Sequence, residues 1–265
     1  MALPFLQWAG GKRIIMDDIM QRVPKKWNHY YEPFLGGGAV FFNLEEYGPI
    51  RATLSDANEE LINAYCMLQT RPADVIDRLR EHSAAHSFTH FYRTRAQHAH
   101  FNPAVRAARF IYLNKTSSFG MHIVNKQGKF KGFMGKVNIP FIVDVANLKD
   151  VHDALVDTTI EAQQFDAIEP GEGDLVYCDP PYDNAFTTYT AQRFSSEDQT
   201  RLRDYCNHWR AAGAHVIVSN NDTPLIRELW SDWKQHKVIA RRNIAGNNVN
   251  KERAAELLMV GNEST

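Results

Sequence analysis

Short apolar strands alternate with helices in the first and last parts of this chain, and this alternation limits the fold more than any other feature of the sequence. Such alternation is typical of a parallel sheet covered by helices, so the sequence predicts an α/β fold. Two later segments, VIARRNIAG at 238–246 and AAELLMVG at 254–261, are expected to close the sheet as an antiparallel pair. Ser195 should cap the last long helix and Gly213 should end it. The other strands are expected at 29–32, 52–56, 175–179 and 214–220, and the helices at 12–22, 36–47, 57–70 and 195–213.

The middle of the chain has a different pattern. From Arg71 to about Leu113 the sequence is mainly helical, with breaks near Ser87 and at Pro103. The tract IVNKQGKF at 123–130 places a Gly at a tight turn between residues that form strands, which predicts a β-hairpin. The predicted domains are an α/β domain at 1–69 and 158–265 and an inserted, mainly helical domain at 70–157.

Charge separates along the chain although the net charge is only −1. No acidic residue occurs between Glu81 and Asp144, so the basic residues of this window are not balanced within it. Such a window favours contact with a polyanion, and nucleic acid is the expected partner. The nine basic residues of the window are Arg93, Arg95, Arg106, Arg109, Lys115, Lys126, Lys129, Lys131 and Lys136.

Composition is that of a soluble globular protein. The 265 residues are 44% hydrophobic and 23% charged, and no apolar run is long enough to span a membrane. The start MALPFLQWAGGK becomes polar too early for a signal peptide. We therefore expect a cytoplasmic protein without membrane contact, and a monomer in solution.

No feature of the sequence predicts a metal site. The cysteines are scattered and odd in number, which argues against a disulfide framework and against a zinc site built from CxxC pairs. His82, His86 and His90 repeat at the spacing of helical metal ligands, but no fourth ligand is evident and we interpret them as polar surface residues. The three cysteines are Cys66, Cys178 and Cys206.

Two sequence features that follow the N-terminal strands indicate a binding site for a nucleoside. The tract EPFLGGGAVFFN ends a strand in glycines that open a helix, which lets the backbone approach a ligand closely. Asp56 ends the next strand, a place from which an acid commonly holds ribose hydroxyls. Because GGGAVF lacks the third glycine of a dinucleotide fingerprint, and no GKS or GKT follows, a nucleoside without a pyrophosphate fits better than NAD or ATP. The structural alternatives are that the glycine segment is only a turn and that Asp56 only caps the following helix.

The tract LVYCDPPY carries the strongest chemical signal. Asp179 follows a buried strand, in the crevice where the glycine turn and Asp56 are expected if the sheet is parallel. Pro180 and Pro181 fix the backbone and lack N–H donors, so they present carbonyl acceptors. With the Tyr182 ring beside them, these acceptors suit a planar group that carries an NH2. The structural alternative is a strand-end turn with a packed tyrosine.

Five motifs, in the order FLQWAGGK, EPFLGGGAVFFN, LSDANEELINAY, DPPY and SNNDTPLIREL, resemble the Dam family of DNA adenine-N6 methyltransferases. The resemblance covers nearly the whole catalytic portion and is weak in the basic insertion, which in this family selects the DNA sequence. It implies a Rossmann-like methyltransferase sheet, S-adenosylmethionine as methyl donor, and an adenine flipped out of double-stranded DNA as acceptor. It also implies a prokaryotic or phage-infected cell, with the enzyme at the nucleoid.

The resemblance further implies roles for individual residues. Trp8 and Lys12 would lie at the cofactor site, and Asp56 would hold the ribose. The reaction would need no metal. The expected loop around the methionine part of the cofactor is Glu32 to Gly38, including Phe34, Gly36 and Gly38, and the expected catalytic residues are Asp179, Pro180, Pro181 and Tyr182, with Asp179 near the cofactor as well.

The predicted reaction is a direct, in-line methyl transfer. The exocyclic amine of adenine is a poor nucleophile because its lone pair is delocalised into the ring, and hydrogen bonds to Asp179 and to the Pro180 carbonyl would localise that pair. Stacking on Tyr182 would offset part of the cost of flipping the base. The expected DNA contacts are Arg93, Arg95, Lys115, Asn125, Lys126, Gln127, Lys129, Lys131 and Lys136.

The sequence leaves alternatives open for the DNA target and for the methylated substrate. Family members that read GATC usually carry an arginine in the hairpin and an NVPFG-like continuation, whereas this chain has Gln127 and KGFMG. Because Gln127 lacks the bidentate contact of arginine to guanine, the target is either a short motif, with GATC in question, or a relaxed one. The alternatives to adenine methylation are methylation of cytosine N4 or of RNA, and a catalytically silent DNA-binding regulator.

Overall fold

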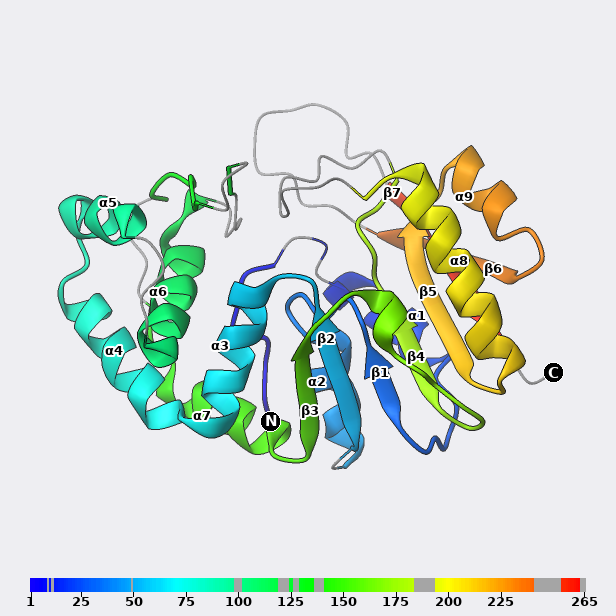
Figure 1. Ribbon diagram of the computed structural model, residues 1–265, viewed down its shortest axis with the longest axis horizontal. Coiled ribbons are helices and arrows are strands. Elements are labelled where there is room, and N and C mark those ends of the chain that lie inside the picture. The colour runs from blue at the N-terminus through cyan, green and yellow to red at the C-terminus, as the bar shows by residue number, and fades with distance from the viewer. Residues whose placement is uncertain are drawn as a thin grey trace.

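A mixed α/β architecture built on one large sheet forms the computed structural model (Figure 1). Its strands are β1 Tyr30–Glu32, β2 Ala52–Asp56, β3 Thr158–Ala162, β4 Leu175–Cys178, β5 His215–Asn221, β6 Lys234–Ala240 and β7 Ala254–Gly261. They lie in the order β3–β2–β1–β4–β5–β7–β6. Strands β1 to β5 run parallel, and β7 pairs antiparallel with both β5 and β6. The predicted α/β fold is therefore confirmed, and so is an antiparallel closing pair. Its first strand begins earlier than predicted, at Lys234, and residues 241–246 of the predicted strand lie outside the described residues.

The structure describes most of the chain, and the following statements concern those residues. They are residues 1–8, 10, 12–48, 50–97, 102–118, 124–125, 129–135, 141–183, 194–240 and 254–262. Within them, every helix is too short or too polar to cross a lipid bilayer.

Helices cover the sheet and extend beyond one end of it. They are α1 Met16–Met20, α2 Ala39–Leu44, α3 Glu59–Thr70, α4 Pro72–Ala84, α5 Phe88–Ala96, α6 Pro103–Thr116, α7 Val145–Leu155, α8 Ser196–Ala211 and α9 Pro224–Leu229. Figure 1 shows α4, α5 and α6 gathered at one end of the molecule and α8 and α9 at the other. The helix expected at 12–22 is instead a 3-10 turn at Lys12–Ile14 followed by the short α1.

The helices between β2 and β3 share a core with the sheet. Phe110 and Ile111 of α6 belong to the same buried hydrophobic cluster as Tyr30 of β1 and Leu54 of β2. Helix α6 also packs against α3 and α4. The segment between α3 and β3 thus rests directly on the rest of the fold, and its assignment as a recognition domain at 70–157 remains a prediction.

The expected hairpin pairing at 123–130 is present in the part that the structure describes. Val124 and Phe130 form an antiparallel bridge. The Asn125 N–H donates to the Lys129 carbonyl at 2.9 Å, and the Lys129 N–H donates to the Asn125 side chain at 3.0 Å. The turn residues 126–128 lie outside the described residues, and so does Lys136.

Helix α8 begins and ends where the sequence predicts. The Ser195 hydroxyl accepts from the Asp198 N–H at 3.2 Å, and the Asp198 carboxylate accepts from the Ser195 N–H at 2.9 Å, so the two residues form a capping box. Gly213 follows the helix with φ +96°, and a Cβ there would lie 3.0 Å from the backbone of Glu172. The helix therefore has to stop at a glycine.

We expect Ser195→Ala to lower the free energy of unfolding by about 1 kcal/mol, because it removes the acceptor of an otherwise unpaired helix N–H. Urea denaturation measures the change. Ser196→Ala, which removes the hydroxyl of the next residue, is the matched control and should cost less than about 0.5 kcal/mol. Equal losses in the two variants would contradict the assignment of the capping box.

Candidate active site

Four polar side chains lie at or next to the carboxyl ends of neighbouring parallel strands. They come from β2, β1, β4 and β5, which follow one another in this order in the sheet. Strand β1 has β2 on one side and β4 on the other, so the strand order reverses there, and open α/β sheets bind ligands at such a point. The four residues are Glu32, Asp56, Asp179 and Ser219.

The glycine loop after β1 is held tightly against β2 and Trp8. The Leu35 N–H donates to the Ser55 carbonyl at 3.0 Å, and the Gly36 N–H donates to the Asp56 carboxylate at 3.1 Å. Gly36 has φ +49°, and a Cβ there would lie 2.8 Å from the Trp8 indole. Gly36 is therefore required both by its backbone conformation and by the close approach of Trp8.

Asp56 is not the cap of helix α3. Asn58 has that role, because its side chain accepts from the N–H groups of Glu60 and Leu61 at 3.1 and 3.2 Å. One Asp56 oxygen accepts from Gly36 and the other from the Asn58 N–H at 2.9 Å. Each oxygen has a further lone pair, and the residue is only partly buried, so its carboxylate can still accept from ligand hydroxyls.

Glu32 lies beneath this loop with 2% of its surface exposed. The Tyr30 hydroxyl at 2.8 Å and the Phe41 N–H at 3.2 Å both donate to the same carboxyl oxygen. Burial raises the pKa of Glu32 to about 8, although these two donors lower it. At neutral pH the side chain is therefore mostly a neutral acid. Its proton can reside on Oε1, the oxygen that accepts neither of these two hydrogen bonds.

Asp179 forms an ion pair with Lys12, in which the lysine is buried and the carboxylate is partly exposed. The Lys12 Nζ lies 2.6 Å from Asp179 Oδ2, donates to the Gly10 carbonyl at 2.6 Å, and lies 4.9 Å from the centre of the Tyr182 ring. The Lys12 side chain is 4% exposed. Burial raises the pKa of Asp179, and the Lys12 ammonium lowers it. Lys12, placed at the cofactor site by resemblance, thus contacts the expected catalytic carboxylate directly.

Residues of the SNNDT motif at the end of β5 hold the segment Asp179–Asp183. The Ser219 hydroxyl donates to Asp179 Oδ1 at 3.2 Å and pairs with the Tyr177 hydroxyl at 2.9 Å. The Asp183 N–H donates to Asn220, and the Asp183 carbonyl accepts from the Asn221 side chain. Two neighbouring strand ends are therefore joined by side chains over several consecutive residues.

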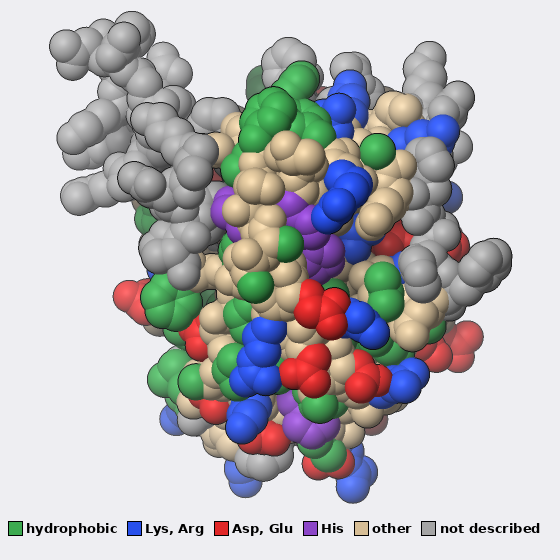
Figure 2. Space-filling model, turned by 90° about the vertical axis from the view of Figure 1, so that its left-hand side faces the viewer, with side chains coloured by type: hydrophobic (Ala, Val, Ile, Leu, Met, Phe, Trp, Pro, Cys, Tyr) green, Lys and Arg blue, Asp and Glu red, His purple; other side chains and the backbone are tan. Residues whose placement is uncertain are grey.

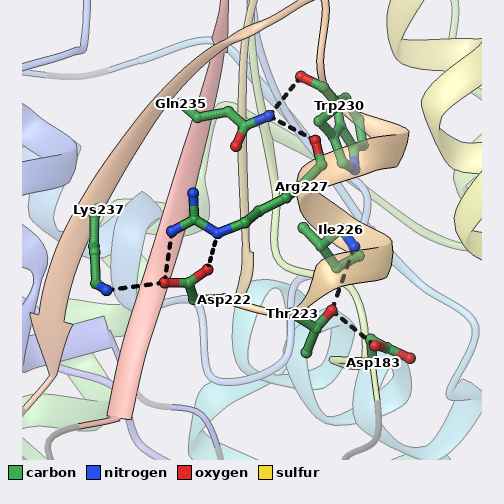
Figure 3. A network of polar contacts seen from close by, with 8 residues as sticks. All are labelled: Asp183, Asp222, Thr223, Ile226, Arg227, Trp230, Gln235 and Lys237. Atoms are coloured by element: carbon green, nitrogen blue, oxygen red, sulfur yellow. Dashed lines mark hydrogen bonds and ion pairs between the residues drawn. The ribbon is translucent and has the colours of Figure 1, made fainter.

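The same network continues into helix α9. Figure 3 shows the Thr223 hydroxyl, which caps α9, donating to the Asp183 carboxylate at 2.8 Å. Next to it, Asp222 accepts from Arg227 and lies 3.2 Å from the Lys237 ammonium of β6. The Asp183 end of the segment is therefore anchored to the cap of a helix that β6 also holds.

Two further side chains hold the segment, and sequence reasoning missed both. The Gln199 amide of α8 donates to the Pro181 carbonyl at 2.9 Å and accepts from Asn220 at 3.1 Å. The Tyr182 hydroxyl donates to Glu256 Oε2 on β7 at 2.7 Å. Their sequence positions carry no local signal for these contacts.

Aromatic rings line the site near the glycine loop. Phe34 stacks on Phe165 with ring centroids 5.4 Å apart and meets Phe194 edge-on at 5.8 Å. Phe165 follows the carboxyl end of β3, the strand that pairs with β2. Of this cluster the sequence analysis named only Phe34, because nothing in the local pattern distinguishes Phe165 from a core residue.

The expected DNA-contacting residues that the structure describes lie in different environments. Lys129 and Lys131 are exposed, and Arg93 is exposed beside His90. Lys115 is partly buried, which lowers its pKa, while Asp144 raises it. Lys126, Gln127 and Lys136 lie outside the described residues.

Arg95 connects helix α5 to the hairpin segment. Its guanidinium donates to the Gly132 carbonyl at 3.1 Å and lies 4.7 Å from the Tyr92 ring and 6.0 Å from the Phe133 ring. Phe88 packs on Tyr92 at 4.5 Å, and both Phe88 and Phe133 are well exposed. This end of the molecule faces the viewer in Figure 2, where acidic side chains gather in the lower half. The basic window thus presents exposed aromatic rings together with its positive charge.

The three spaced histidines pack on Tyr112 and are not free surface groups. The His82 ring stacks on the Tyr112 ring at 4.6 Å, and a His86 ring nitrogen pairs with the Tyr112 hydroxyl at 3.0 Å. His82 and His90 pair at 2.9 Å, and burial lowers the pKa of His82 to about 4. The histidines are partly exposed, as expected for polar surface residues, and they also join α4, α5 and α6 around one ring.

Comparison with known proteins matches this chain to one enzyme family. The model of the D12 class N6 adenine-specific DNA methyltransferase family matches residues 8–244. The type II methyltransferase M1.LlaDCHI of Lactococcus lactis subsp. cremoris is 34% identical over 97% of this chain and 94% of its own length. The type II methyltransferase M.MjaIII of Methanocaldococcus jannaschii is 31% identical over 91% of this chain and 92% of its own length. The DNA adenine methylase of Escherichia coli (strain K12) is 30% identical over 96% of this chain and 93% of its own length.

We expect Glu32→Gln to flatten the dependence of stability on pH. Between the ordinary value of 4.5 and the folded value of about 8, the folded protein holds a proton that the unfolded chain has lost. Wild-type stability therefore falls as pH rises through this window, on the order of 2–4 kcal/mol more than in the variant. Urea unfolding at about pH 5 and pH 8 measures the difference, with the exposed Glu59→Gln as control. Parallel curves for Glu32→Gln and wild type would contradict the buried neutral acid.

Proposed function

The chain belongs to the D12 class of N6 adenine-specific DNA methyltransferases, and from this membership we propose that it transfers the methyl group of S-adenosylmethionine to the N6 amine of an adenine flipped out of double-stranded DNA. As a member of this class it is an adenine-specific DNA methyltransferase. The cofactor, the extrusion of the base and the individual site residues are parts of the proposal. Its main support is the preorganised segment Asp179–Tyr182, whose carboxylate is fixed by Lys12 and Ser219.

The residues around the glycine loop fit S-adenosylmethionine. Gly36 and Gly38 have left-handed backbones, which bring the loop close to Trp8 and to Tyr65. Asp56 keeps lone pairs that can accept from the two ribose hydroxyls, and the aromatic cluster at Phe34 offers a flat apolar surface for a purine. When bound, the cofactor supplies an electrophilic methyl group on a sulfonium. None of these contacts requires a phosphate-binding loop.

Asp179 and the Pro180 carbonyl would accept the two hydrogens of the adenine amine. One Asp179 oxygen is paired with Lys12 and the other with Ser219, so the carboxylate is fixed in one orientation before substrate binds. Each oxygen retains a lone pair for the amine. Because the amine gains positive charge as its lone pair attacks, a nearby fixed carboxylate stabilises the transition state more than the ground state. Tyr182 would stack on the flipped ring.

The basic window would contact the phosphates of the duplex. Its exposed members include Lys129, Lys131 and Arg93, and Arg95 ties the hairpin segment to α5. We place reading of the target in this segment, with the hairpin around Gln127. The target is a short motif or a relaxed one, and the protein acts as a monomer in the cytoplasm of a prokaryotic or phage-infected cell, at the nucleoid.

Methyl transfer from labelled S-adenosylmethionine tests the proposal. We expect label in N6-methyladenine after digestion of duplex DNA to nucleosides, and single-molecule sequencing of unmethylated genomic DNA then maps the target. Asp179→Ala should lower the rate roughly a hundredfold or more, since it removes the charge that stabilises the amine. Asp157→Ala, an exposed acid before β3, is the control and should leave the rate unchanged.

Other distributions of label would redirect the proposal. Label in N4-methylcytosine or in RNA alone would refute adenine methylation of DNA. DNA binding without any transfer in wild type would favour a silent regulator. Transfer that survives Asp179→Ala at full rate would refute the assigned carboxylate and leave the activity standing.

We expect Lys12→Met to move the acid limb of the rate–pH profile to higher pH. Burial raises the pKa of Asp179 and the Lys12 ammonium opposes the rise, so removal of the ammonium lets the pKa rise further. Asp179 must be ionised to act, so the variant should lose more activity at about pH 6 than at about pH 9. The exposed Lys149→Met is the control. An equal loss at every pH would indicate that Lys12 serves only the cofactor.

A further inference from the structure

Glu256 approaches the proposed active site from a part of the fold outside the family match. The match ends at residue 244, and Glu256 lies beyond it on β7. Strand β7 pairs with both neighbours, so that Glu256 is opposite Asn221 of β5 and Val238 of β6. A residue fixed by ladders on both sides has little freedom to move its backbone.

The Glu256 carboxylate is nearly buried and accepts from one catalytic side chain. Glu256 is 8% exposed, and the Tyr182 hydroxyl donates to its Oε2 at 2.7 Å. A buried carboxylate needs donors, and a hydrogen bond to a charged acceptor is among the strong ones. Burial raises the pKa of Tyr182 well above its ordinary value, and the nearby acids raise it further, so the phenol keeps the proton that it donates.

The Tyr182 ring is thereby held at two places. Glu256 binds the hydroxyl at its outer end, and the Lys12 ammonium lies over one ring face at 4.9 Å. At its inner end, the Pro181 carbonyl is fixed by Gln199. A tyrosine held only by its backbone could turn about two side-chain torsions. The hydroxyl contact fixes the direction in which the side chain leaves the backbone, and the Lys12 ammonium over one face opposes rotation of the ring about its own axis.

The same contact decides which acid accepts the hydrogen bond from the Tyr182 hydroxyl. Tyr182 also interacts with Asp179, whose pKa is raised by burial and lowered by Lys12, Ser219 and Tyr182. A phenol has one proton to donate, and in this structure it goes to Glu256. The acceptor capacity of Asp179 is therefore kept for another donor.

We infer that Glu256 is a positioning residue: it fixes the direction of the Tyr182 side chain, and with it the place of the ring, for the flipped adenine and keeps the Tyr182 hydroxyl away from Asp179. The inference rests on the proposed function, because it assigns Tyr182 to the stacked base. Glu256 itself touches neither substrate nor cofactor in this account. It acts through Tyr182.

Fluorine NMR tests the contact without reference to activity. In protein labelled with 3-fluorotyrosine, the resonance absent from Tyr182→Phe belongs to Tyr182. We expect Glu256→Ala to shift or broaden this resonance, because the ring loses its anchor, and Glu256→Gln to change it less, because the amide oxygen still accepts. The exposed Glu228→Ala of α9 is the control. An unchanged resonance in Glu256→Ala would overturn the inference.

A double-mutant cycle tests the consequence for catalysis. Glu256→Ala should lower kcat roughly tenfold, the scale of one hydrogen bond to a charged group, with little change in KM for S-adenosylmethionine. Tyr182→Phe should lower kcat as well, and Glu256→Ala should add little in that background, because the two residues act through one contact. Glu256→Gln should recover most of the rate.

The outcomes separate this inference from the proposed function. Losses that add fully in the double variant, or an effect on KM alone, would overturn the positioning role. A wild-type protein that transfers no methyl group to DNA would refute the proposed function instead, and with it the assignment of Tyr182 to a flipped adenine. The fluorine spectrum would then still decide whether Glu256 fixes the ring.

Discussion

The ion pair between the buried Lys12 and Asp179 connects the parts of this protein. A carboxylate at the end of a central strand loses hydration, which raises its pKa, and a fixed cation nearby lowers that pKa again. The cation comes from the N-terminal loop, at 2.6 Å from the carboxylate. That loop is held in turn by Asn114 of α6, whose side chain exchanges two hydrogen bonds of 2.8 Å with the backbone of Gln7. A helix from the middle segment of the chain therefore holds the N-terminal segment that leads to Lys12.

The sheet order explains why one segment can be held from so many sides. Strands β4 and β5 are parallel neighbours, so the segment after Cys178 runs beside the end of β5. Side chains at the β5 end, Ser219, Asn220 and Asn221, reach successive groups of that segment. Strand β7 then covers the other side of β5 and adds Glu256. Preorganisation of this kind is what a reaction with little covalent chemistry on the protein requires.

Local sequence patterns predicted the parts of the fold that depend on neighbours in the chain. The strand that precedes Asp179, the capped helix at Ser195 and the glycine turn at Gly36 all follow from short-range rules. Contacts such as Tyr182 with Glu256 depend on which strands become adjacent, and no spacing in the sequence carries that information. The spaced histidines show the converse, because their helical spacing was recognised but the Tyr112 ring that gathers them was not.

The measurement that tests the account most directly is a crystal structure of the protein with duplex DNA and sinefungin, a cofactor analogue that transfers no methyl group. The account predicts a flipped adenine on the Tyr182 ring, with N6 about 3 Å from both the Asp179 carboxylate and the Pro180 carbonyl. An adenine that remains stacked in the duplex, or one whose amine points away from Asp179, would contradict it.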